Sequence, residues 1–298
     1  MWAEARSSLR TVRDLLRFAV SRFSEAGLAF GHGSDNPWDE ASYLILRTLH
    51  LPPGKLEPVL DASLTRHEVE QVLEIVRRRI EERVPAAYLT REAWLGDFRF
   101  YVDERVLVPR SHIASLLSAG LSPWVHDQQR VTRVLDLCTG SGCLAILAAH
   151  AFPEAMVDAT ELSREALQVA QRNVADYELE QRLRLVHGDL FEGLGEARYD
   201  VIIANPPYVT SESMAALPQE YRAEPELALA GGEDGLSVVR RILQQAGSRL
   251  TTEGTLVVEI GDNREALEAS YPGLEFIWPS LAAGGERVFV LTARQLAC

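Results

Sequence analysis

Three stretches near the start of the chain repeat apolar residues at spacings of three and four, as one face of an amphipathic helix does. They cover residues 9–23, 36–49 and 65–84. Helix-start signals precede two of them. Asn36 stands before a proline, and Thr65 has Glu68 three residues on, as in a capping box. The pattern predicts a small helical bundle at the N-terminus.

Alternating apolar and polar residues follow over residues 94–102 and predict a hairpin that turns at Gly96-Asp97. From Thr132 on, strand-like and helix-like stretches alternate, which predicts an α/β domain whose parallel sheet carries helices on both faces. The expected strands are residues 132–137, 156–161, 183–187, 199–204 and 255–260. The expected helices are residues 142–151, 163–177, 235–250 and 263–270.

Two further strand-like stretches, residues 274–278 and 287–291, lie near the end of the chain. The segment between them contains Ala282-Ala283-Gly284-Gly285 and leaves no room for a helix, whereas a parallel crossover needs about a dozen residues. If these strands are neighbours, they therefore pair antiparallel. The expected sheet has seven strands, the last of them antiparallel.

The length of 298 residues favours two domains. We expect an N-terminal helical domain at residues 1–90, a hairpin and linker at 91–115, and an α/β domain at 116–298. No apolar run is long enough for a membrane span and the N-terminus lacks a secretion signal, so we expect a cytoplasmic protein without a membrane partner. Cys138, Cys143 and Cys298 are too few and too irregularly spaced for a disulfide framework or a zinc site, and we expect no metal.

Charge is distributed unevenly along the chain. Of the 30 basic and 43 acidic residues, 16 and 17 lie within residues 1–115, so the remaining 14 and 26 give residues 116–298 a net charge of −12. An acidic surface repels the phosphate backbone and attracts basic proteins. The balance favours a basic protein over nucleic acid as the main partner, while leaving room for a local basic patch that contacts nucleic acid.

The sequence Asn205-Pro206-Pro207-Tyr208, the NPPY loop, follows the expected strand at 199–204. Ligands bind at the carboxyl ends of strands in open α/β sheets. The prolines remove two N–H donors, so the carbonyls of Asn205 and Pro206 are left free as acceptors. An Asn side-chain oxygen beside a bare carbonyl can hold both hydrogens of an –NH2 group, and the Tyr208 ring offers a flat face to a planar substrate. A plain proline turn is the structural alternative.

A glycine-rich loop follows the first strand of the α/β domain. The strand leads through Asp136 into the glycine loop, Cys138-Thr139-Gly140-Ser141-Gly142. Its glycines permit a tight turn and close approach of a ligand to the backbone at a helix start. Gly140-x-Gly142-x-x-Ala145 also fits a dinucleotide fingerprint. Asp136 would repel a pyrophosphate, however, and suits an α-ammonium group such as that of S-adenosylmethionine.

Two more strand ends carry acidic residues. Glu161, at the end of the second strand, can accept both hydroxyls of a ribose. Asp189, after the third strand, can accept a hydrogen bond from an adenine amino group, with Leu190 packed on the ring. A capping or solvated carboxylate is the alternative for each acid.

With these motifs the chain closely resembles the class I S-adenosylmethionine-dependent methyltransferases that modify the side-chain nitrogen, N5, of glutamine in proteins of the translation apparatus. Cys138, Cys143 and residues 106–111 and 217–227 resemble the branch that acts on the third protein of the large ribosomal subunit. Glu161 departs from the Asp that is common in the family, but its longer side chain should still reach a ribose.

The resemblance implies a Rossmann-like fold, S-adenosylmethionine as methyl donor and S-adenosylhomocysteine as product. It implies that Asn205, Pro206 and Tyr208 carry the transfer, and that Asn205 also borders the cofactor. Pro207, Arg110 and residues 209–234 become candidate substrate contacts. The implied partner is a ribosomal protein, with room for contact with ribosomal RNA but no sequence-specific binding of nucleic acid.

Other functions stay open on sequence alone. The release-factor branch of the same family usually has smaller residues in place of the two cysteines. Enzymes that methylate the exocyclic amines of adenine or guanine in nucleic acid share the NPPY loop, but normally carry a basic face. A ribosome-assembly factor without catalysis would not need Asn205, and an oxidoreductase leaves Asp136 and the NPPY loop unexplained.

Overall fold

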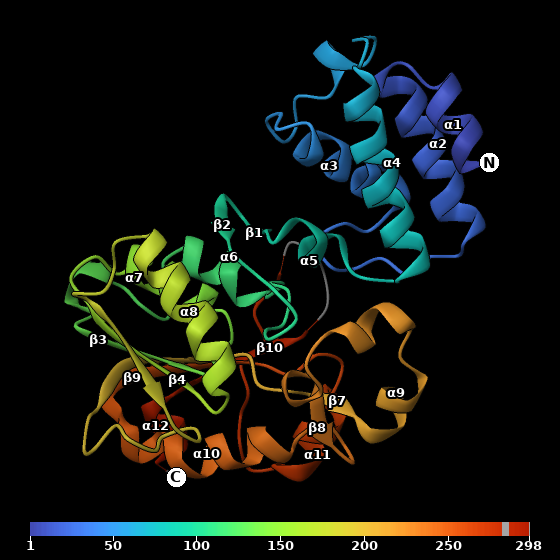
Figure 1. Cartoon of the computed structure of the whole chain (residues 1–298). Helices are drawn as coiled ribbons and strands as arrows, with labels where there is room; N and C mark the ends of the chain where they lie inside the picture. The colour runs from blue at the N-terminus through green and yellow to red at the C-terminus, as the bar shows by residue number, and fades with distance from the viewer. Residues whose placement is uncertain (282–285, 298) are drawn as a thin grey trace. The chain divides into compact units, whose positions relative to one another are not determined.

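The computed structural model describes residues 1–281 and 286–297, so Ala282-Ala283-Gly284-Gly285 and Cys298 lie outside the described residues. The chain forms two compact units (Figure 1). The helical unit consists of Met1–Ala93, Val102–Glu104 and Pro218–Ala223. The sheet unit consists of Trp94–Tyr101, Arg105–Leu217 and Glu224–Cys298. No helix in the described ranges is long and apolar enough to cross a membrane.

The caps predicted for the helical unit are confirmed. Its helices are α1 (Trp2–Ser8), α2 (Val12–Glu25), α3 (Pro37–Thr48), α4 (Arg66–Glu81) and α5 (Ala86–Thr90), with the 3₁₀ turn η1 (Glu57–Val59). The Asn36 side chain accepts two N–H groups at the start of α3, and Thr65 and Glu68 form a capping box before α4. A further capping box at Thr11 makes α2 begin later than its apolar pattern does. The short α1 and α5 have too few turns to show a repeat.

A buried ion cluster lies inside the helical unit. Arg79 on α4 is fully buried and donates to Glu40 on α3, with Nε and Oε1 2.7 Å apart. Glu220, from Pro218–Ala223, is also buried and accepts from Arg79 at 3.4 Å and from the Ala29 N–H group at 3.1 Å. Because a buried charge must be paired, this cluster binds Pro218–Ala223 to the helices.

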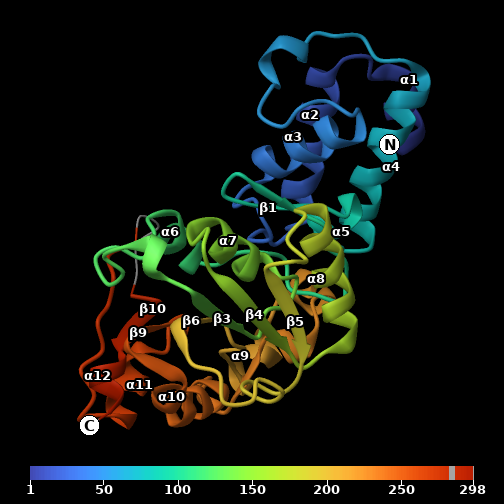
Figure 2. The ribbon, with the colours of Figure 1, turned by 90° about the vertical axis from the view of Figure 1, so that its left-hand side faces the viewer.

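The sheet unit is organised around a mostly parallel sheet in the order β10-β9-β6-β3-β4-β5 (Figure 2). The strands are β3 (Arg133–Leu137), β4 (Met156–Glu161), β5 (Leu183–His187), β6 (Tyr199–Ala204), β9 (Leu250–Glu259) and β10 (Val288–Thr292). Neighbouring strands are parallel except for β10, which is antiparallel to β9. The predicted sheet type and its antiparallel last strand are confirmed.

Residues 274–278 do not form the predicted strand, so the sheet has six strands within residues 1–281 and 286–297. This stretch contributes only an isolated antiparallel bridge between Ile277 and Val290. Its aromatic residues pack on the sheet instead, with the rings of Phe276 and Trp278 at 5.0 and 6.1 Å from the ring of Phe289. The apolar pattern therefore reflects side-chain packing and not a strand ladder.

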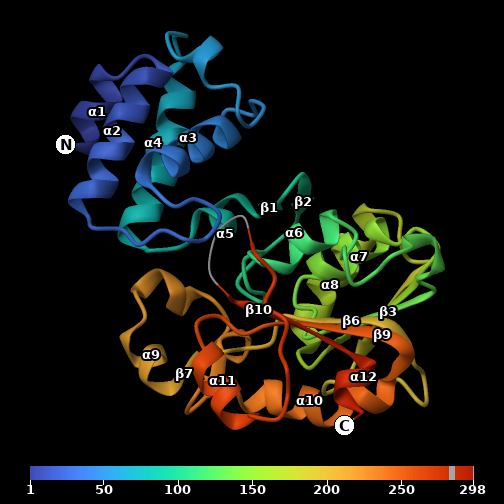
Figure 3. The ribbon, with the colours of Figure 1, turned by 180° about the vertical axis from the view of Figure 1, so that it is seen from behind.

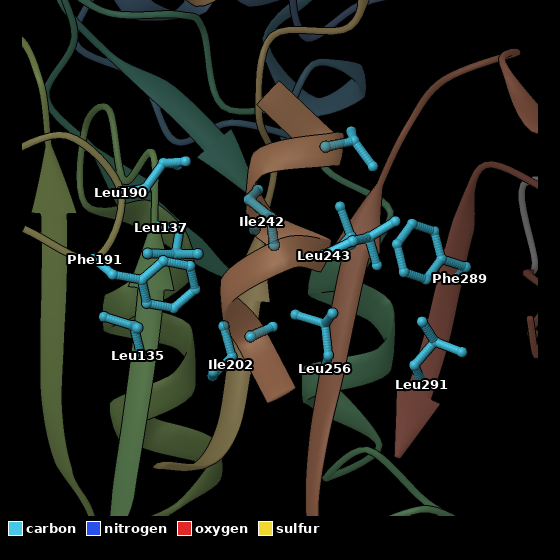
Figure 4. Close-up of a cluster of buried hydrophobic side chains, with 14 of the residues drawn as sticks. Leu135, Leu137, Leu190, Phe191, Ile202, Ile242, Leu243, Leu256, Phe289 and Leu291 are labelled. Atoms are coloured by element: carbon cyan, nitrogen blue, oxygen red, sulfur yellow. The ribbon is translucent and has the colours of Figure 1, made fainter. Parts of the chain in front are cut away.

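Helices cover both faces of the sheet (Figures 2 and 3). One face carries α6 (Ile113–Ser118), α7 (Cys143–Ala151) and α8 (Arg164–Asp176), and the other carries α10 (Ser237–Arg249), α11 (Arg264–Ser270) and α12 (Ala293–Leu296). Figure 4 shows Ile242 and Leu243 of α10 packed over Ile202 and Leu256 of the sheet. This close packing fixes the positions of the strand ends.

Short elements connect these layers. They are β1 (Ala93–Leu95) and β2 (Phe98–Phe100), which form the predicted hairpin, η2 (Gln128–Arg130), β7 (Val209–Thr210), α9 (Ser211–Ala216), η3 (Gln219–Ala223), η4 (Glu226–Ala228) and β8 (Ala230–Gly232). β7 and β8 pair in a second small sheet that directly follows the NPPY loop.

Candidate active site

The sheet register brings the predicted strand-end residues together. Leu137 of β3 pairs with Thr160 of β4 on one side and with Ala204 of β6 on the other. Glu161 pairs with His187 of β5. Because these strands are parallel, the glycine loop, Glu161, Asp189 and the NPPY loop all follow at one edge of the sheet.

The glycine loop is held against the end of β4. The Thr139 N–H group donates to the Thr160 carbonyl at 3.0 Å, and the Gly140 N–H group donates to Glu161 Oε2 at 2.9 Å. Gly142 caps α7 with φ at 81°, where a Cβ would lie 3.3 Å from the Ala170 side chain. A side chain at this position would be strained and crowded, which explains the glycine.

Asp136 is a buried carboxylate with one unused oxygen. The Thr139 hydroxyl donates to Oδ2 at 2.5 Å, whereas Oδ1 has no hydrogen-bond partner among the described residues. Burial raises the pKa of the Asp136 carboxyl to about 7, although the hydrogen bond from the Thr139 hydroxyl lowers it. Among the described residues, no positive group stabilises this carboxylate.

Each carboxylate oxygen of Glu161 accepts one hydrogen bond from the backbone. Oε2 accepts from Gly140, and Oε1 accepts the Ser163 N–H group at 2.9 Å. Each oxygen keeps a lone pair for another donor. Leu162, the next residue, is an apolar residue that is 48% exposed, a feature that the sequence analysis missed.

Asp189 and Leu190 lie at the end of β5. Asp189 forms an ion pair with Arg241 of α10, with Oδ2 and Nη2 2.8 Å apart. Leu190 is only 4% exposed and packs with Leu137 and Phe191 in the core (Figure 4). Its side chain has little surface left to offer an adenine ring, so the predicted stacking on Leu190 stays a prediction that the burial disfavours.

Cys138 begins the glycine loop and Cys143 directly follows it, and both side chains are protonated thiols. Burial raises the pKa of both, that of Cys143 to about 12, so neither is a nucleophile at neutral pH. Cys138 has φ at 58° and Leu190 at 52°. Such left-handed backbone at non-glycine residues costs energy and concentrates at functional sites.

The NPPY loop presents free acceptors. The Asn205 side chain and the Pro206 carbonyl make no hydrogen bond within the part of the chain that the structure describes. Asn263 Nδ2 donates to the Tyr208 carbonyl at 2.8 Å, and the Tyr208 hydroxyl lies 3.4 Å from Glu259 Oε1. Burial and then the Glu259 charge raise the pKa of Tyr208, so its hydroxyl stays protonated.

Arg110 forms an ion pair with Glu224 of the same chain. Its Nη1 lies 2.6 Å from Oε1 of Glu224 and its Nη2 pairs with Oε2. The buried Glu224 also accepts the Val108 N–H group at 3.0 Å. The role of Arg110 as a substrate contact therefore stays a prediction.

The sequence analysis also missed two buried polar residues. Asn173 of α8 donates to the Ser141 carbonyl at 2.8 Å and accepts the Tyr101 N–H group at 2.8 Å, which ties the glycine loop to the segment after β2. Glu259 ends β9 and is 1% exposed. Glu259 stands among apolar residues in its predicted strand, and Asn173 shares a face of its predicted helix with Val169 and Ala170, which was the available signal.

Comparison with known proteins agrees with this architecture. The Methyltransferase small domain family matches residues 121–220. The hMettl16 catalytic domain in complex with the MAT2A 3'UTR hairpin 6 has a similar fold, with a TM-score of 0.52 at 16% identity, covering 76% of this chain and 80% of that one. The structural match shows a shared fold, and the family match indicates a methyltransferase domain within residues 121–220.

Curated relatives are similar over nearly the whole chain. The ribosomal protein uL3 glutamine methyltransferase of Bordetella pertussis is 58% identical, covering 98% of both chains. Those of Neisseria meningitidis serogroup B and Burkholderia pseudomallei are 57% and 59% identical, covering 99% and 96% of this chain and 97% and 96% of theirs. The chain belongs to the ribosomal protein uL3 glutamine methyltransferase family, which confirms the resemblance found in its motifs.

Proposed function

We propose that this chain transfers a methyl group from S-adenosylmethionine to the side-chain amide nitrogen of a glutamine in ribosomal protein uL3. The unpaired acceptors of the NPPY loop carry this proposal, since they suit an –NH2 group. Relatives at 57–59% identity are named for that activity. A ribosomal substrate also suits the cytoplasmic location expected from the sequence.

The strand-end residues fit S-adenosylmethionine, which supplies an electrophilic methyl group on a sulfonium. Asp136 suits the α-ammonium group because its buried Oδ1 lacks a partner in the described residues. Glu161 keeps one lone pair per oxygen for the ribose hydroxyls, and Asp189 keeps Oδ1 for the adenine amino group. Leu162 offers the adenine an exposed apolar face.

A glutamine amide is a poor nucleophile because its lone pair is delocalised into the carbonyl. The Asn205 oxygen and the Pro206 carbonyl would accept both amide hydrogens and favour a nitrogen that becomes tetrahedral and positive. The methylated nitrogen is acidic enough to lose its proton without a dedicated base. Tyr208 would pack against the amide plane and hold it for in-line attack.

The same acceptors would also hold an exocyclic amine of adenine or guanine. The net charge of −12 on residues 116–298 disfavours a nucleic-acid substrate and favours a basic ribosomal protein. The mass of uL3 from cells with and without this protein tests the choice. We expect the loss of one methyl group from uL3 in cells that lack it, whereas an unchanged mass would contradict the proposal.

Affinity for S-adenosylmethionine should depend on pH through Asp136. The α-ammonium group binds the carboxylate and not the protonated acid, so affinity is full above the raised pKa of about 7 and is lost as the pH falls through it. We expect a decrease approaching about tenfold per pH unit below 7, a range in which an α-amino group of pKa about 8 stays charged. Isothermal titration from about pH 6 to 7.5 measures it. D136N should bind weakly with no such slope, and an equal slope in D136N would contradict the assignment.

Substrate choice should reside in residues 1–90 and 209–234. The motifs assigned to the cofactor other than Asn205 lie between Asp136 and Leu190, whereas Pro218–Ala223, inside the 209–234 segment, belongs to the helical unit. An exchange must move both parts together, because Glu220 forms buried ion pairs with Arg79.

A chimera with both parts from a release-factor-modifying relative tests this assignment. It should methylate release factors and ignore uL3, measured as methyl incorporation into each purified protein. Retained activity on uL3 alone would place selection in the sheet unit.

A further inference from the structure

Glu259 lies beside the NPPY loop in the sheet register. Ala204 of β6 pairs with Val258 of β9, so the next residues along these parallel strands are Asn205 and Glu259. The Glu259 side chain is buried, yet no lysine or arginine pairs with it in the described ranges. A buried carboxylate without a cationic partner needs several hydrogen-bond donors.

Those donors come from the NPPY loop and from the segment before α6. Oε2 of Glu259 accepts the Ser111 hydroxyl at 2.6 Å and the His112 N–H group at 3.0 Å. Oε1 faces the Tyr208 hydroxyl at 3.4 Å. Glu259 thus joins Tyr208 to a segment that the Arg110–Glu224 ion pair also holds.

The Tyr208 ring is held from a second side. Gly261 has φ at 57°, and a Cβ there would lie 2.7 Å from Tyr208 Cε2, so the ring packs directly on the Gly261 backbone. Asn263 holds the Tyr208 carbonyl at 2.8 Å. Gly261 and Asn263, in the connection between β9 and α11, therefore fix the backbone and the ring edge of Tyr208. The hydroxyl of Tyr208 contacts Glu259 instead.

We propose that Glu259 is a positioning residue for methyl transfer, which sets the orientation of the Tyr208 ring through the Tyr208 hydroxyl. The proposal rests on the proposed function, in which the substrate amide packs on this ring. A displacement of about 1 Å in a reacting group can cost about 100-fold in rate, so the angle of the ring affects the rate. Glu259 acts on the substrate only through Tyr208.

The test is a double-mutant cycle of E259Q and Y208F. A glutamine keeps one acceptor oxygen, but its –NH2 group cannot accept from Ser111, His112 or Tyr208. The matched control is the pair Tyr199 and Asp158, in which the hydroxyl donates to the buried Oδ2 at 2.8 Å. Asp158 lies opposite Leu135 in the sheet register, three residues before Glu161, so Y199F and D158N remove a buried Tyr–carboxylate bond without touching the NPPY loop. D158N also breaks the ion pairs of Asp158 with Arg133 and Arg184, so Y199F is the closer control.

We expect E259Q and Y208F each to lower kcat on purified uL3 by about 10- to 100-fold, with KM for uL3 and the Kd for S-adenosylmethionine within about twofold of wild type. The double variant should be no slower than the slower single variant, because both changes break one connection. D158N and Y199F should lower the melting temperature and leave kcat unchanged.

Three results would overturn the proposal while wild-type transfer to uL3 stands. They are a normal kcat in E259Q, an equal effect of E259Q with and without the Tyr208 hydroxyl, or kcat losses in D158N and Y199F that match those at Glu259. If E259Q fails to fold, Y208F alone tests the proposal. A normal kcat in Y208F would show that the contact between the Tyr208 hydroxyl and Glu259 does not affect the rate. Absence of wild-type transfer to uL3 would instead reject the proposed function.

Discussion

Replacing Asn205 with alanine is expected to reduce kcat by about 100- to 1,000-fold, the scale of roughly 2.7–4 kcal/mol for losing one preorganised group that stabilises the transition state. The side-chain oxygen of Asn205 is free in the described chain, so nothing in the fold depends on it. The Kd for S-adenosylmethionine should stay close to the wild-type value, because most of the proposed cofactor contacts lie at the ends of β3, β4 and β5.

Single-turnover rates beside isothermal titration of the cofactor separate these two effects. T292A is a suitable control, since it removes a Thr that accepts the Gln295 N–H group at the start of α12 and should cost about 1 kcal/mol of stability without lowering kcat. Near-normal turnover of N205A would remove Asn205 from the mechanism, and a parallel loss of cofactor binding would move its role to the cofactor.

Replacing Asp136 or Glu161 is expected to weaken cofactor binding by about 10- to 100-fold, the effect of losing a charged hydrogen bond worth roughly 1.5–3 kcal/mol. The two changes should differ in stability. D136N removes a buried carboxylate whose pKa is raised to about 7, so the ligand-free protein should gain stability near neutral pH. E161A removes the acceptor of the Gly140 and Ser163 N–H groups, so it should lose stability.

Isothermal titration and thermal unfolding of the ligand-free variants measure both quantities. Unchanged affinity in both variants would contradict the cofactor assignment. A large loss of stability in D136N would show that the Asp136 charge is compensated in the fold, and would remove the reason for placing an ammonium group there.

Local signals in the sequence predicted the parts of the site that lie at strand ends. The apolar run before Asn205 predicts a strand that ends in the NPPY loop. The glycines after Asp136 likewise mark the loop that follows the first strand of the α/β domain. A parallel sheet then places such loops at one edge without further information. The helix caps at Asn36 and Thr65 are similarly local, because a cap involves residues within one turn.

Contacts between distant residues could not be predicted in this way. Glu220 and Arg79 are 141 residues apart, so no periodic pattern connects the 218–223 segment to the helices. The aromatic residues near Phe276 resemble a strand because packing on a sheet selects the same residue types as pairing does. The partners of Arg110 and Glu259 likewise appear only after the chain has folded.

Methyl transfer to a glutamine of uL3 through Asn205 can be measured directly. Purified uL3 is incubated with S-adenosylmethionine and either the wild-type protein or N205A, and is then examined by tandem mass spectrometry. With the wild-type protein we expect one methyl group on the side-chain nitrogen of a glutamine in uL3. With N205A we expect almost none in the same time. A methyl group on another kind of residue, equal modification by N205A, or unmodified uL3 would contradict this expectation.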